Sequence, residues 1–259
     1  MKINFWILAL AILLPAAGHA DCHHSFSVGV LTDSPYYATK PRFYATGLVR
    51  DLLEKIEKKG SCKFQETPLN YVRALQELRG SRLDLFAFTA RIPSWLEVAD
   101  YKVVYSSTRS LIVRKDAFKK ELSLSHYLQN PKIKYGNLIG TVMFFLPEEI
   151  DKLMKENRIV QSSTAAGVVQ LATSGKAQVF FVTPVYLRFL QKDPSFKDKF
   201  EVIPDPVNHI DIGLYVSKKR VPSKEGEQLK KTIDELREDG TIMTVLKKYV
   251  SDEDIKAYR

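Results

Sequence analysis

The stretch LDLFAFTARIPSWLE, residues 83–97, decides the fold. Its first half is an apolar run that predicts a buried strand. Pro93 ends regular strand pairing because it has no backbone N–H to donate and its φ is fixed. Thr89 and Arg91 lie between this strand and the proline, and the indole of Trp95 follows. Ligands of α/β proteins bind at the carboxyl ends of strands, so this stretch is the first candidate for a binding site.

The sequence before this stretch predicts two more strands and two helices. The strands are expected over residues 26–31 and 63–66, where apolar residues cluster or alternate with polar ones. A helix is expected from Leu48, and a second follows Asn70, a residue type that caps helix N-termini. This strand–helix–strand–helix–strand order implies right-handed crossovers and therefore a parallel sheet.

The pattern restarts after Asp116. We expect helices over 123–128, from Gly140-Thr141 to Met154 and after Thr164, and strands over 132–136, 159–160 and 178–182. The last strand ends at Thr183-Pro184, much as the first series ends at Pro93, and two similar halves predict two lobes facing one cleft. The first lobe would comprise residues 21–112 plus 213–259, and the second 113–212, with strands near 111–113 and 210–212 crossing as a hinge.

The first twenty residues predict a cleaved signal peptide. Lys2 precedes an apolar run over residues 3–14, and small residues follow up to Ala20. The run is short for a bilayer span, and a retained membrane anchor is the alternative interpretation. We expect a mature protein that is exported to the periplasm.

The basic composition does not point to nucleic acid. The 259 residues carry a formal net charge of +9, but Lys and Arg are interleaved with Asp and Glu. This distribution is typical of a solvated basic surface, so no nucleic-acid partner is expected.

The only two cysteines, Cys22 and Cys62, predict one disulfide in an oxidising compartment. Each precedes a strand, and parallel neighbouring strands would place both at one edge of the sheet. After cleavage, His23 would be the third residue, where the free amine, two amides and an imidazole can bind Cu(II) or Ni(II). The alternative for this end is a flexible tail. No cofactor is expected.

Several segments resemble the periplasmic solute-binding proteins of ABC importers, in the polar amino-acid-binding group called family 3. GLVRDL at 47–52 is similar to the family's G-F-x-x-D-L, and LREDGT at 236–241 with Lys248-Tyr249 matches its ending L-x-x-D-G-T…K-Y. The segment from Arg73 to Asp84 adds to the likeness. The resemblance implies a monomeric, two-lobed α/β fold of type II. Each lobe would be a mainly parallel sheet flanked by helices, with the ligand cleft between the lobes.

The resemblance also implies a ligand site that differs from the family's pattern. Amino-acid binders hold the α-carboxylate with an Arg just after T-P-E, and ARIPSWLE at 90–97 places Trp95 at that position. Gly140-Thr141 matches the second lobe's G-T at a helix N-terminus, whose N–H groups bind carboxylate. Thr183 stands where the family has an Asp for the α-ammonium. A standard α-amino acid is therefore not the expected ligand.

The candidate ligand-binding residues combine aromatic, hydroxyl and cationic side chains. They are Tyr36, Tyr37, Phe88, Thr89, Arg91, Trp95, Gly140, Thr141, Thr183 and Tyr186. Arg91 either holds an anion or is a surface residue, and Trp95 either stacks on the ligand or plugs a disused pocket. Of Tyr36 and Tyr37, which stand where the family has an aromatic over the ligand, we expect one to line the cleft.

The predicted function is capture of a small polar solute, neutral or anionic, for the membrane subunit of an ABC importer. A non-transporting sensor or scaffold that kept the fold and lost the pocket is one alternative. A dehydratase-like enzyme is another, since a few proteins of this fold are dehydratases. Asp33, Glu97 and Asp211 could supply an acid or base, but nothing in the sequence singles them out. We therefore expect no catalytic residue.

Overall fold

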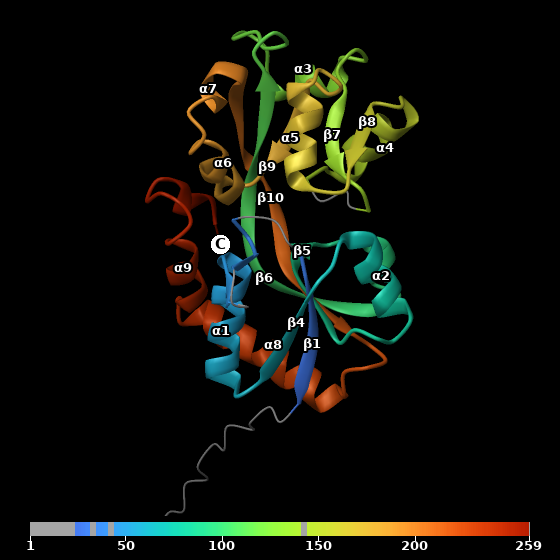
Figure 1. Ribbon diagram of the computed structural model, residues 1–259, viewed down its shortest axis with the longest axis vertical. Coiled ribbons are helices and arrows are strands. Elements are labelled where there is room, and N and C mark those ends of the chain that lie inside the picture. The colour runs from blue at the N-terminus through green and yellow to red at the C-terminus, as the bar shows by residue number, and fades with distance from the viewer. Residues whose placement is uncertain (1–23, 32–34, 41–43, 141–143, 259) are drawn as a thin grey trace, which may run out of the picture.

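The computed structural model describes residues 24–31, 35–40, 44–140 and 144–258. Its elements form two lobes stacked along the longest axis of the molecule (Figure 1). Two long antiparallel strands, β6 (Ala99–Arg114) and β10 (Phe200–Ser217), run from one lobe into the other. A single eight-stranded sheet therefore extends through both lobes, in the order β4-β1-β5-β10-β6-β9-β7-β8.

The sheet of the first lobe has the predicted parallel core. β1 (Ser25–Val30) lies between β4 (Lys63–Pro68) and β5 (Leu85–Ala90) and is parallel to both. One face packs against α1 (Leu48–Gly60), α8 (Ser223–Glu238) and α9 (Thr241–Leu246). The other packs against α2 (Tyr71–Arg79) and the short helix η1 (Pro93–Trp95). Buried side chains of β5 contribute to both cores: Leu85 and Ala87 belong to the first, and Phe86 between them belongs to the second.

The second lobe repeats this layered arrangement. β7 (Tyr135–Leu138) lies between β8 (Ile159–Ser162) and β9 (Val179–Val182), parallel to both. α3 (Leu124–Gln129) and α4 (Pro147–Lys155) contribute to the core on one face. The other face is covered by α5 (Ala165–Thr173), α6 (Pro184–Leu190) and α7 (Phe196–Lys199).

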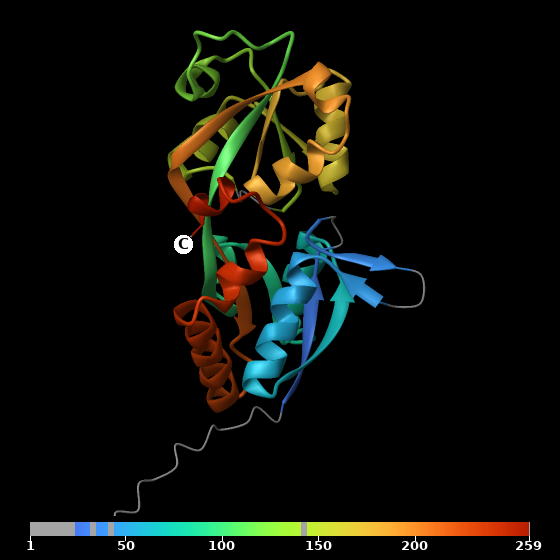
Figure 2. The ribbon, with the colours of Figure 1, turned by 90° about the vertical axis from the view of Figure 1, so that its left-hand side faces the viewer.

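Two small elements complete the described chain. β2 (Ala38–Lys40) and β3 (Tyr44–Thr46) form a separate antiparallel pair. The C-terminal segment carries the short helix η2 (Asp254–Ala257) and reaches the junction of the lobes (Figure 2). There Tyr258 pairs with Ser107 of β6, and its hydroxyl accepts a hydrogen bond from Val185 N at 3.2 Å. The C-terminus thus contacts α6 of the second lobe.

Gly47 fixes the start of α1 against the loop that follows β1. Its φ is +116°, and a Cβ there would lie 2.5 Å from the carbonyl oxygen of Tyr36. The close approach lets Val49 N donate to Tyr36 O at 2.9 Å. The glycine of GLVRDL therefore places Tyr36, which proves important for the site.

Two predicted helix starts have different outcomes. Asn70 caps α2 as expected, because its side chain accepts a hydrogen bond from Arg73 N at 2.8 Å. The helix expected from Gly140-Thr141 to Met154 is described only from Pro147, where α4 begins: proline suits the first turn, and the Glu149 carboxylate accepts from Leu146 N at 2.8 Å. Because residues 141–143 lie outside the described ranges, the anion-binding role expected of Gly140-Thr141 stays a prediction.

A candidate ligand-binding cavity between the lobes

A cavity of about 70 Å³ lies between the two lobes. Its lining residues from the first lobe include Leu31, Tyr36, Tyr71, Phe88 and Tyr105. Those from the second lobe include Asn137, Phe144, Phe181, Thr183 and Tyr186. None of the lining residues that the structure describes is Lys, Arg, Asp or Glu. The cavity therefore has the apolar, mostly aromatic walls and few polar groups that are typical of small-molecule sites.

Three of the predicted site residues meet across the cavity. The hydroxyl of Tyr36, in the first lobe, is hydrogen-bonded to the hydroxyl of Thr183, in the second. The rings of Tyr36 and Tyr186 are nearly parallel, with centroids 6.1 Å apart and 6° between planes. Thr183 also caps α6, because its hydroxyl accepts from Tyr186 N at 3.4 Å. We call Tyr36, Thr183 and Tyr186 the cross-lobe clasp.

Tyr105 is a cavity residue that sequence reasoning missed. It lies on β6, opposite Ile212 of β10, and its side chain is 4% exposed. Burial raises the pKa of its hydroxyl well above the usual value, with the nearby tyrosines adding to the effect. The sequence predicts a strand only near residues 111–113 of this long element. The part of β6 that contains Tyr105 was therefore not recognised as a strand.

Thr89 lies just behind the cavity wall. It is fully buried, and its hydroxyl is hydrogen-bonded to the hydroxyl of Tyr71 at 2.7 Å. Its carbonyl oxygen accepts from Tyr101 Oη at 2.7 Å, and Tyr101 also donates to Asp211 O at 2.8 Å. Thr89 therefore supports Tyr71, which lines the cavity, while its neighbour Phe88 is itself part of the lining.

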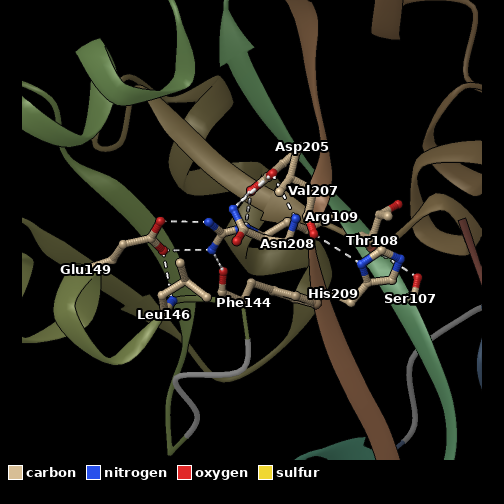
Figure 3. Close-up of polar contacts among 10 residues, drawn as sticks. All are labelled: Ser107, Thr108, Arg109, Phe144, Leu146, Glu149, Asp205, Val207, Asn208 and His209. Atoms are coloured by element: carbon tan, nitrogen blue, oxygen red, sulfur yellow. Dashed lines mark hydrogen bonds and ion pairs between the residues drawn. The ribbon is translucent and has the colours of Figure 1, made fainter.

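A buried cation stands behind the second lobe's wall (Figure 3). The Arg109 side chain is fully buried, and its guanidinium lies over the Phe181 ring, 4.2 Å from the centroid. It donates two hydrogen bonds of 2.7 Å to Glu149 and one of 2.8 Å from Nε to Asp205. A further hydrogen bond joins Arg109 to the carbonyl oxygen of Phe144. These acceptors occupy all three guanidinium nitrogens.

The Arg109 network connects the cavity wall with both crossing strands. Glu149 belongs to α4, Arg109 to β6 and Asp205 to β10, where the strand pairing is interrupted between Asp205 and His209. Burial by itself would raise the pKa of Asp205. Hydrogen bonds from Asn208 and Arg109 outweigh that effect and hold its pKa below the usual value. Asp205 is therefore ionised near neutral pH and balances the arginine.

Comparison with known proteins identifies the fold and the family. The profile of bacterial extracellular solute-binding proteins, family 3, matches residues 26–252. The chain belongs to this family. No curated protein sequence matches it significantly.

Solved structures of similar fold include both solute binders and a sensor. A histidine kinase sensor domain with similarity to periplasmic binding proteins is 13% identical, with a TM-score of 0.73 over 89% of this chain and 97% of its own. A putative ABC-transporter binding component from Wolinella succinogenes, complexed with lysine, is 16% identical, with a TM-score of 0.72 over 88% and 96%. An ancestral arginine-binding protein bound to arginine is 16% identical, with a TM-score of 0.71 over 88% and 99%. At these identities the likeness shows the fold alone.

In this family 3 protein, Trp95 does not contact the cavity. Its side chain is 1% exposed and packs in the first lobe's core, with ring centroids 5.3 Å from Phe86 and 5.0 Å from Tyr215. Of the two interpretations of Trp95, stacking on a ligand is therefore not supported by its position. η1 turns the indole inward, where a large apolar side chain is more stable than at a solvated rim.

Three other candidates of this solute-binding protein also lie away from the cavity lining. Arg91 is exposed. Tyr37 is buried in the first lobe, where burial and the neighbouring Glu66 raise its pKa. Gly140 lies at the lobe junction, where a Cβ would be 3.1 Å from Tyr71 Cβ. The expectation that these residues contact a ligand is not supported by their positions.

The remaining predictions for this family member fall partly outside the described chain. Thr141, Cys22 and His23 lie outside the described residues, so the disulfide and the N-terminal metal site stay predictions; Cys62 itself is buried. Within the described ranges, no cluster of His, Cys, Asp and Glu is arranged to hold a metal ion. No helix in the same ranges is long and apolar enough to cross a membrane.

Proposed function

We propose that this family 3 protein encloses a small solute between its lobes and delivers it to the membrane subunit of an ABC importer. The observation that carries the proposal is a cavity whose walls come from both lobes and are joined by the cross-lobe clasp. A site shared in this way couples occupancy to lobe closure, because only the closed arrangement brings both walls to the solute.

The proposal includes the predicted processing and lobe boundaries. Residues 1–20 act as a signal peptide that is removed on export to the periplasm. Residues 21–112 plus 213–259 form the first lobe and 113–212 the second. β6 and β10, which run through both lobes, serve as the hinge. The protein works as a monomeric binder and not as an enzyme, and a nucleic acid is not among its partners.

A thermal-shift screen of small metabolites tests this function. A solute at about 100 times its Kd stabilises the folded protein by about 2.7 kcal/mol, which raises the melting temperature measurably. A matched control is Ala165→Phe, because Ala165 lines the cavity at the partly exposed first residue of α5 and a phenyl ring there fills the space. We expect a solute that shifts the wild type and not this variant. A library without any such solute would contradict the proposal.

A non-transporting sensor or scaffold is the second candidate function. The observation in its favour is the small volume of the cavity between the lobes, about 70 Å³, which leaves little room for a solute. The fold is also found in a histidine kinase sensor domain. This alternative predicts that the radius of gyration, measured by small-angle X-ray scattering, stays constant across the library. A transport receptor becomes more compact with its solute.

A further inference from the structure

Tyr105 differs from Tyr36 and Tyr71 in the hydrogen bonding of its hydroxyl. Tyr36 is hydrogen-bonded to Thr183 and Tyr71 to Thr89. The Tyr105 hydroxyl makes no hydrogen bond to any residue that the structure describes, although its side chain is 96% buried and lines the cavity. The buried polar atoms that lack a partner among the described residues do not include Tyr105 Oη, so this hydroxyl is not sealed off by the protein and is open to a ligand in the cavity.

The walls around Tyr105 are suited to a flat apolar ring. Phe88 comes from the first lobe, and Phe144, Phe145 and Phe181 from the second. Aromatic side chains favour stacked or edge-on contacts with another ring, beyond the burial of apolar area alone. Walls of this kind on both sides therefore favour a ring over an extended polar chain.

The charges around the cavity disfavour an ionic solute. The described lining has no Lys, Arg, Asp or Glu, and the charge of the nearby cation, Arg109, is already balanced by Glu149 and Asp205. A carboxylate or ammonium entering this space loses its hydration and finds no opposite charge among these residues. An uncharged solute avoids this loss.

The cavity volume limits the solute to one small ring. The space measures about 70 Å³. An engineered apolar cavity of about 150 Å³ in another protein holds benzene, so one ring already requires the lobes to part slightly. The clasp between Tyr36 and Thr183 is a contact that such parting would loosen.

We propose that the solute is an uncharged single-ring compound with a hydrogen-bonding group, and that Tyr105 Oη is the polar group that recognises it. This inference rests on the proposed solute-binding function and specifies the ligand class of the same cavity. Tyr105 then determines specificity: the aromatic walls bind the ring, and the hydroxyl distinguishes rings that carry a polar group from those that do not.

Four chemical probes test the proposal on the full mature chain by isothermal titration calorimetry. Benzyl alcohol has the ring and a hydroxyl, toluene has the ring alone, benzoate has a charged ring, and lysine is a charged amino acid. We expect benzyl alcohol to bind about tenfold more tightly than toluene, as one hydrogen bond allows, and benzoate and lysine to bind more weakly than either.

Two variants isolate the hydroxyl. Tyr105→Phe should weaken benzyl alcohol about tenfold and leave toluene unchanged, a split that a merely structural role would not produce. Tyr135→Phe is the control, because it removes the hydroxyl of another buried tyrosine that has no hydrogen bond among the described residues and does not line the cavity. It should leave all four affinities unchanged.

The outcomes separate this inference from the proposed function. Equal binding of benzyl alcohol to the wild type and Tyr105→Phe overturns the role of Tyr105. Tighter binding of benzoate or lysine than of benzyl alcohol overturns the ligand class but leaves solute binding in place. If none of the ring probes binds, the proposed ligand class is wrong. The proposed function is contradicted only if no compound of the metabolite library binds either.

Discussion

Arg109 is the residue whose loss should affect stability most among the ion-paired side chains described above. Arg109→Met leaves Glu149 and Asp205 buried without their cation, and breaking a buried pair in this way costs about 3–5 kcal/mol. Urea denaturation should show this loss. Lys58→Met is the control, because its pair with Glu54 is exposed and should contribute less than about 1 kcal/mol. Equal losses in the two variants would contradict the prediction.

Asp205 should make the protein less stable in acid. Its folded-state pKa lies below the usual value, so its contribution is present above the unfolded pKa of about 4 and is lost as the pH falls through the folded pKa. Asp205→Asn should therefore flatten the decline of unfolding free energy between pH 5 and pH 2, relative to the wild type, while lowering stability at pH 7. An unchanged slope would show that Asp205 does not contribute.

Individual site residues were the least predictable part of the molecule. Tyr36, Phe88, Thr183 and Tyr186 were named from sequence and do line the cavity. The family resemblance places Trp95 at the position of a ligand-binding residue, but no local pattern shows that a three-residue helix turns it into the core. The direction of such a side chain depends on tertiary packing, which a short motif does not contain.

The paired strands β6 and β10 require close backbone contact at Gly213. A Cβ at Gly213 would lie 2.3 Å from the carbonyl oxygen of Lys102, where the pairing register shifts. Gly213→Ala should therefore lower the unfolding free energy, by about 1–3 kcal/mol as overpacking usually does. Gly226→Ala is the matched control within α8: its Cβ would find the nearest atom at 3.4 Å, and alanine stabilises a helix interior by up to about 1 kcal/mol. Denaturation curves of the two variants should give changes in unfolding free energy of opposite sign. Changes of the same sign would contradict these expectations.

A disulfide between Cys22 and Cys62 would join the segments before β1 and β4. Those strands are parallel neighbours, with Ser25 paired to Lys63, so the two segments begin at the same sheet edge. Reduction should lower the unfolding free energy by about 2–4 kcal/mol. Thiol titration of the unfolded, unreduced protein should find no free thiol, and two reactive thiols would contradict the pairing.

Strands with a strong local sequence pattern were predicted well. The two long strands that pass from one lobe to the other were predicted only in part. β1, β4 and β5 were found with their parallel order, because apolar runs and helix caps are local. β6 and β10 contain 16 and 18 residues, yet only short parts of each were recognised. Their middle sections alternate irregularly in burial as they pass from one lobe to the other, so no single period marks them.

The two-lobed organisation followed from repetition in the sequence, but the contacts between the lobes did not. The repeat of helix, buried strand, Thr and Pro predicted the fold class that the family profile confirms. The hydrogen bond between Tyr36 and Thr183 joins residues 147 positions apart and depends on how far the lobes approach. Sequence reasoning therefore placed the site between the lobes without indicating what holds them together.

The cross-lobe clasp should control how often the lobes separate. Tyr36→Phe removes the hydrogen bond to Thr183 and keeps the ring that stacks on Tyr186. A net loss of about 0.5–1.5 kcal/mol would raise the ratio of open to closed molecules about 2- to 12-fold, seen as a larger radius of gyration in small-angle X-ray scattering. Thr183→Val should have the same effect, and the double variant should add little because both changes remove one interaction.

Tyr37→Phe is the control that separates lobe opening from a general loss of stability. Tyr37 is the next residue in the chain, but its buried side chain lies beside Glu66 within the first lobe. Its substitution can lower the melting temperature without weakening any contact between lobes, so the radius of gyration should not change. If Tyr37→Phe enlarges the molecule as much as Tyr36→Phe does, the clasp is not what holds the lobes together. The C-terminal contact of Tyr258 with α6 would then be the next structure to test.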